Sequence, residues 1–81
     1  MLKIASKTKL KPEQVIKKAV EFFGPSGNKL KVTEQSEACV SFEGMGGMVR
    51  VDVCPQGKLT EVVMETREFE YQAKEFLQKI K

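Results

Sequence analysis

Residues 38–66 decide the fold, and they read ACVSFEGMGGMVRVDVCPQGKLTEVVMET. Apolar and polar residues alternate along most of this stretch with a period of two, which is typical of half-buried strands. The segments GMGG (44–47) and PQGK (55–58) interrupt the alternation and are typical of tight turns, in which we expect glycines 44, 46 and 47 to supply positive φ. The stretch therefore predicts two successive β-hairpins, with strands at 38–43, 48–54 and 59–66.

The alternation also predicts the register of the first hairpin. A turn centred on residues 45–46 places Phe42 opposite Val49 and Val40 opposite Val51. All four apolar side chains then lie on one face, whereas a slip of one residue would move half of them to the other face.

The strand predicted at 59–66 carries apolar residues on both of its faces, so the charged residues decide which face is buried. Glu61 and Glu65 share one face, and burying them unpaired would be costly. Val62 and Met64 are therefore expected to face the core. Val63 is expected on the open face, which would be charged.

Four further elements flank the hairpins. The patterns predict a strand at 2–8, a helix at 12–23 that starts with Pro12 and ends at a left-handed Gly24, a strand at 29–34, and a helix at 69–80 with Thr66 as its N-cap. Four consecutive strands joined by short loops form an antiparallel meander, and the first strand most simply joins beside the fifth.

The sequence thus predicts one α+β domain, residues 1–81, with the order β-α-β-β-β-β-α. We expect a five-stranded antiparallel sheet with two helices packed on one face. The composition, 41% hydrophobic and 31% charged, is that of an ordinary globular protein. No apolar run approaches the length of a membrane span or resembles a signal peptide, so we expect a cytoplasmic protein.

The two cysteines do not indicate a disulfide or a metal site. In the predicted register Cys39 and Cys54 lie diagonally on the open face, where disulfide geometry is marginal. Two thiols in a chain without histidine also make a poor zinc set. We expect no metal and no cofactor.

The element order resembles two known architectures. Lys11-Pro-Glu-Gln-Val15 and the closing helix over Phe69–Ile80 resemble the helix-grip fold of the START or birch-pollen-allergen-like (SRPBCC) superfamily, and the order is also similar to one half of the TATA-binding protein saddle. The helix-grip resemblance implies an apolar small molecule held between the last helix and the sheet. Its implied lining is Phe22, Phe42, Met64, Phe69, Phe76 and Leu77. The alternative is that these residues simply fill the core, because a domain of 81 residues needs most of its large apolar side chains for stability.

A second hypothesis is protein interaction, including homodimerisation through the first strand or the open sheet face. The candidate surface residues are Lys3, Lys7, Met45, Met48, Val63 and Tyr71. Nucleic acid binding is less favoured, because carboxylates on the open face would repel phosphates and no outward strand position is aromatic.

An enzyme is the least favoured class. The chain has no histidine for base catalysis and no phosphate-binding loop. Cys39 would lie beside Asp52, and a neighbouring carboxylate raises the pKa of a thiol, which is unfavourable for a nucleophile. The sequence therefore predicts a small non-catalytic binding domain.

Overall fold

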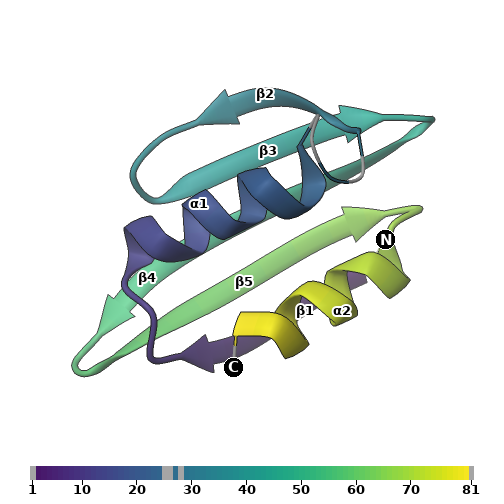
Figure 1. Cartoon of the computed structure of the whole chain (residues 1–81). Coiled ribbons are helices and arrows are strands. Elements are labelled where there is room, and N and C mark those ends of the chain that lie inside the picture. Colours follow the sequence, from purple (N-terminus) through teal and green to yellow (C-terminus); the bar gives the residue numbers. More distant parts are fainter. Residues whose placement is uncertain (1, 25–26, 28, 81) are drawn as a thin grey trace.

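A five-stranded antiparallel sheet forms one layer of the structure, and two helices form the other (Figure 1). The computed structural model describes residues 2–24, 27 and 29–80. The helices are α1 (Pro12–Phe23) and α2 (Glu70–Ile80). The strands are β1 (Leu2–Thr8), β2 (Lys31–Gln35), β3 (Cys39–Gly44), β4 (Gly47–Gln56) and β5 (Leu59–Arg67).

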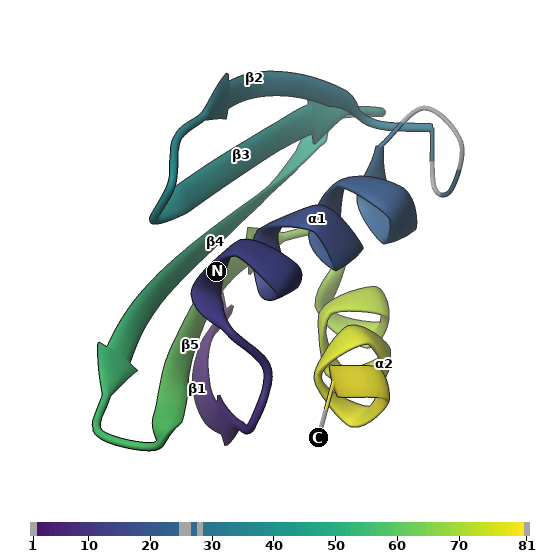
Figure 2. The ribbon, with the colours of Figure 1, turned by 60° about the vertical axis from the view of Figure 1, so that its left-hand side comes forward.

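The strand order is β1-β5-β4-β3-β2, which confirms the meander and the place of the first strand beside the fifth. Figure 2 shows both helices on the same side of the curved sheet. The apolar faces of the strands point toward that side, and the core lies between the two layers. The predicted α+β class and element order are therefore confirmed.

The predicted register of the β3–β4 hairpin is also confirmed. Val40 lies opposite Val51 and Phe42 opposite Val49, and all four side chains are buried. The turn itself differs from the expectation: Met45 and Gly46 have positive φ values of 49° and 79°, whereas Gly44 and Gly47 do not. Positive φ at both central residues is typical of a two-residue type I′ turn, which matches the twist of the flanking strands.

Strand β4 is longer than predicted, because it continues through Pro55 to Gln56. The backbone N–H of Val53 donates to the carbonyl of Ala38, so the nitrogen of Pro55, two residues later, faces the same side. Strand β3 begins at Cys39 and provides no partner there. The proline consequently removes no hydrogen bond from the ladder.

Two predicted details around β2 are wrong. The strand spans Lys31–Gln35 instead of 29–34, and its register shifts between Val32 and Glu34, as in a β-bulge. Gly24 ends α1 with a φ of −71°, so it is not left-handed, although its N–H still donates to the carbonyl of Val20 over 2.9 Å. Among the described residues of this connection, Lys29 is left-handed, with a φ of 63°.

The predicted N-cap of the last helix is also wrong. Thr66 lies within β5, is buried, and donates from Oγ1 to the carbonyl of Met48 over 2.9 Å. The strand continues to Arg67 because Thr66 pairs with residues on both neighbouring strands. Glu68, with a φ of 74°, then turns the chain into α2.

Buried threonines tie the sheet to the segments that surround it. Thr8 donates from its hydroxyl to the carbonyl of Ile80 at the end of α2, and Thr60 donates to the carbonyl of Leu10 over 2.7 Å. A buried hydroxyl is costly without a partner, and each of these has one. The ends of β1 and α2 and the β1–α1 connection are thereby fixed against one another.

Candidate functional site

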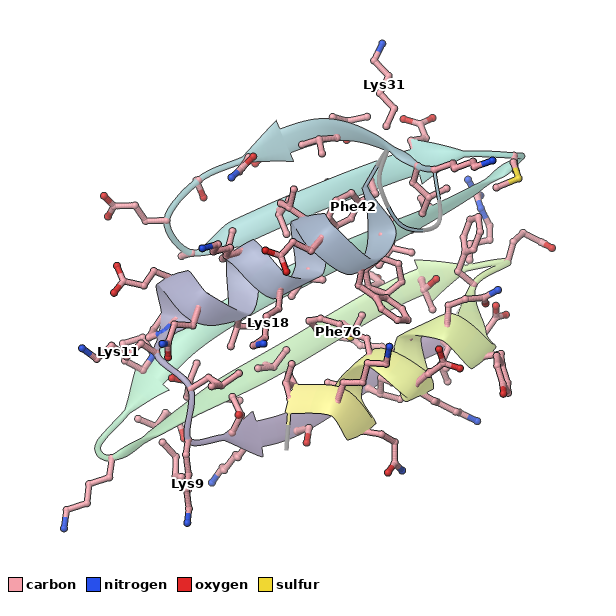
Figure 3. The ribbon with its side chains drawn as sticks, viewed as in Figure 1. Lys9, Lys11, Lys18, Lys31, Phe42 and Phe76 are labelled. Carbon is pink, nitrogen blue, oxygen red and sulfur yellow. The ribbon has the colours of Figure 1, made fainter. Side chains whose placement is uncertain are left out.

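The six residues that the helix-grip resemblance implies as a ligand lining pack together in the core. All except the half-buried Phe22 are buried. The ring centroids of Phe22 and Phe76 are 5.7 Å apart, and Phe23 lies 5.5 Å from Phe76 and 5.6 Å from Phe42. Figure 3 shows Phe42 and Phe76 over the sheet, in the region that the two helices cover. The structure thus joins these aromatic rings through Phe23, which the ligand hypothesis did not include.

A groove of about 1230 Å³ lies beside α1, away from this aromatic cluster. Figure 2 shows the β2–β3 hairpin set apart from the first half of α1. The groove is lined by residues of α1 and of the β2–β3 turn and is open to solvent. Its apolar lining comes from α1, from the β2–β3 turn and from the inner face of β4: Pro12, Ile16, Val20, Ala38, Val53 and Pro55.

The rim of the groove carries charges of both signs. Lys11 and Lys17 line it together with Glu13 and Glu37. An apolar floor with a few polar groups at its edge is the usual composition of a small-molecule site. The arrangement therefore has the chemistry of a site for an apolar body with polar groups near its edge.

The sequence predicted α1 as a helix packed on the sheet, but it did not predict the groove beside the helix. The sequence feature that could have indicated the groove is the wide apolar stripe along α1, where residues 15, 16, 19, 20, 22 and 23 are all apolar. The curved sheet covers only part of such a wide stripe, so Val20 remains half-buried and faces the groove.

A smaller hollow of about 260 Å³ lies between the two helices. Phe22 and Phe76 line it, and the Nζ atom of Lys79 lies 4.8 Å from the ring centroid of Phe22, where a cation–π contact forms. Its lining is less apolar than the lining of the groove. The groove beside α1 is the better candidate.

The predicted interaction residues do not form one patch. Lys3, Lys7 and Val63 share the open sheet face, because Ala5 lies opposite Val63 and the two lysines flank Ala5. Met48 is half-buried on β4, opposite Glu43 and Arg67. Met45 at the hairpin turn and Tyr71 in the first turn of α2 are each 74% exposed.

The open face also holds the pair of Cys39 and Asp52, which are opposite each other as predicted. Burial raises the pKa of the Cys39 thiol, and the hydrogen bond and negative charge of Asp52 raise it further. Arg50 forms an ion pair with Asp52, with 3.2 Å between Nε and Oδ2. Cys39 is thus a neutral, poorly reactive thiol at neutral pH.

We expect the two cysteines to differ in their reaction with iodoacetamide, which requires the thiolate. The rate for Cys39 should rise with pH to a midpoint above the ordinary value of 9.0, and at a pH of about 8 it should be at least about tenfold below the rate for the exposed Cys54. Mass spectrometry of the labelled peptides measures both rates, and labelling in urea provides the unfolded control. A midpoint for Cys39 at or below 9.0 would contradict the burial of this thiol.

No three Cys, Asp or Glu side chains are grouped closely enough to hold a metal ion in residues 2–24, 27 and 29–80. Within the same described residues, neither helix is long and apolar enough to cross a membrane.

Comparison of the sequence with models of known protein families finds no match, and comparison with curated proteins finds none either. Among solved structures, the fold is similar to the solution structure of the Aha1 dimer from Colwellia psychrerythraea, with a TM-score of 0.56 and 14% sequence identity. The alignment covers 98% of this chain and 88% of that chain. At this identity the likeness shows the fold alone. It is compatible with the helix-grip resemblance and supports nothing more specific.

Proposed function

We propose that this protein is a small, non-catalytic binding domain and that the groove beside α1 binds an apolar small molecule. The observation that carries the proposal is the apolar floor of the groove, where Val20, Ala38 and Pro55 remain accessible. A ligand in this position would bury apolar surface that the fold leaves in contact with water.

The space between α2 and the sheet is a less favourable place for the ligand. Phe76 and Phe42 fill it and are almost fully buried. A ligand there would have to displace an aromatic side chain from the core, at a cost on the order of 3–5 kcal/mol. The groove requires no such displacement.

The test is to fill the groove with a side chain. Ala38→Trp is expected to weaken the binding of the apolar dye anilinonaphthalene sulfonate at least about tenfold, because the indole would occupy the groove. Thr33→Trp is the matched control, since Thr33 is exposed on β2 and does not line the groove. Fluorescence titration measures the affinity, and a native mass spectrum of freshly purified protein shows whether a small molecule is carried along.

Equal weakening by both tryptophan variants, or no dye binding by the unaltered protein, would reject the groove as the site. Each variant must also unfold cooperatively, because the same dye binds loosely packed states.

A second candidate function is homodimerisation through the free edge of β1. The solved structure to which the fold is similar is described as a dimer. In an antiparallel sheet the N–H groups of successive residues point to opposite sides of a strand. The N–H of Val53 on β4 donates to Ala38, on the side away from β5. The pairing of β4 with β5 and of β5 with β1 then places the N–H of Ala5 on the side away from β5, toward the open edge. Backbone groups of that edge could pair with a second copy.

Ala5→Pro tests this edge without removing a bond of the sheet. If β1 is the interface, sedimentation equilibrium should show the dimer replaced by a monomer with an unchanged circular dichroism spectrum. Antiparallel pairing about Ala5 would set Lys3 against Lys7 of the second copy, so higher salt should strengthen such a dimer. A dimer that persists in Ala5→Pro would exclude this edge and favour the open face with Met48 and Val63.

A further inference from the structure

Two segments far apart in the sequence form one end of the molecule. The β1–α1 connection, residues 9–11, lies beside the β4–β5 turn, residues 57–58 (Figure 1). Thr8 pairs with Thr60, whose hydroxyl donates to the carbonyl of Leu10 over 2.7 Å. The two segments are therefore held together by the fold. We call residues 7–11 and 56–59 the basic tip.

The basic tip concentrates positive charge. It contains Lys7, Lys9, Lys11 and Lys58, all exposed, and no acidic residue. These four charges exceed the net charge of +3 of the whole chain, so the remainder of the chain is net acidic. Figure 3 shows Lys9 and Lys11 projecting outward at this end, whereas Lys31 projects from the opposite side.

A carboxylate lies directly beside the basic tip. Glu61 lies opposite Lys7 across the strands and accepts a hydrogen bond from Gln56 over 3.4 Å. Lys58 lies at the tip of the hairpin, and Lys9 lies in the connection that follows β1. Lysines clustered at one end give the molecule a polarised field, which attracts and orients it toward an anionic surface.

The basic tip also presents apolar side chains among its lysines. Leu59, next to Lys58, is 37% exposed, and Leu10, between Lys9 and Lys11, is half-buried. Lysines around exposed leucine suit the surface of a lipid bilayer, where the ammonium groups meet anionic headgroups and the apolar side chain enters between them. A single-stranded nucleic acid would instead favour exposed aromatic rings, and residues 7–11 and 56–59 include none.

We propose that the basic tip docks this protein reversibly on membranes that contain anionic lipids. The partner is the headgroup region of a phosphatidylserine-type bilayer. Lys9, Lys11 and Lys58 supply the electrostatic attraction, and Leu59 supplies a shallow apolar contact. Lys11 also lines the groove beside α1 and Lys7 belongs to β1, so the test changes only Lys9 and Lys58, which belong to neither.

The test is cosedimentation of the whole protein with vesicles of phosphatidylcholine that contain about one quarter phosphatidylserine. Each lysine near such a surface strengthens binding about fivefold, so the double variant Lys9→Gln/Lys58→Gln should bind about 30-fold more weakly. Lys31→Gln/Lys74→Gln makes the same change in net charge at exposed sites outside the basic tip and should lose less than about threefold. Thermal unfolding of each variant verifies that the fold is retained.

Leu59→Ser separates the bilayer from a nucleic acid. It should weaken vesicle binding about three- to tenfold, because it removes the apolar contact while keeping every charge. The proposal is overturned if the unaltered protein binds these vesicles no better than pure phosphatidylcholine, or if the control double variant loses as much as the tip variant. Tighter binding to a single-stranded oligonucleotide, unaffected by Leu59→Ser, would also overturn it.

Discussion

Phe76→Ala is expected to lower the free energy of unfolding by about 3–5 kcal/mol, which is a large part of the stability of so small a domain. The ring of Phe76 is 1% exposed and packs against both Phe22 and Phe23. Its removal would leave a cavity between α2, α1 and the sheet. Urea denaturation followed by circular dichroism measures the loss.

Two control variants test whether the loss of stability comes from the removed volume of the buried ring. Phe76→Leu keeps most of the volume and should cost below about 1.5 kcal/mol. Lys74→Ala on the exposed side of the same helix should change stability by less than about 0.5 kcal/mol. A loss below about 1 kcal/mol for Phe76→Ala would show that the space under α2 is loosely filled, and the ligand position implied by the helix-grip resemblance would then regain support.

Gly47→Ala is expected to have the second largest effect, a loss of about 3 kcal/mol. A Cβ atom on Gly47 would lie 2.5 Å from the carbonyl oxygen of Arg67, 2.6 Å from Cε2 of Phe69 and 2.7 Å from Cβ of Glu68. The first of these is a backbone atom, so the junction of β5 and α2 would have to move. Denaturation in urea, compared with the unaltered protein, measures the loss.

Gly44→Ala is the matched control, because Gly44 pairs directly with Gly47 across the same turn. Neither glycine has a positive φ, so alanine strains the backbone at neither position. The nearest atom to a Cβ on Gly44 is Cδ2 of Leu30 at 3.1 Å, the flexible end of a side chain, and the cost should be below about 1 kcal/mol. Equal losses for the two variants would mean that the close approach of Gly47 to Arg67 does not determine its identity.

The sequence by itself determined the sheet. The period of two in residues 38–54 predicted the pairing of Val40 with Val51 and of Phe42 with Val49, because only one register buries every apolar side chain of that hairpin. The order of helices and strands followed from periods and turn residues, and short loops required an antiparallel meander. Such features depend on residues close together in the chain.

The tertiary structure decided what depends on residues far apart in the chain. The local sequence predicts Thr66 as a helix cap, but its pairing with strands on both sides keeps it in β5. The local sequence predicts Gly47 as a turn residue, but the junction of β5 and α2 packs against it and requires its small size.

Both candidate sites arise in the same way. The groove exists because the curved sheet covers only part of the wide apolar stripe of α1. The basic tip exists because β1 pairs with β5, which brings the connection that holds Lys9 to the same end as the turn that holds Lys58. Curvature and long-range pairing set which surfaces remain uncovered, and local periodicity carries no information about either.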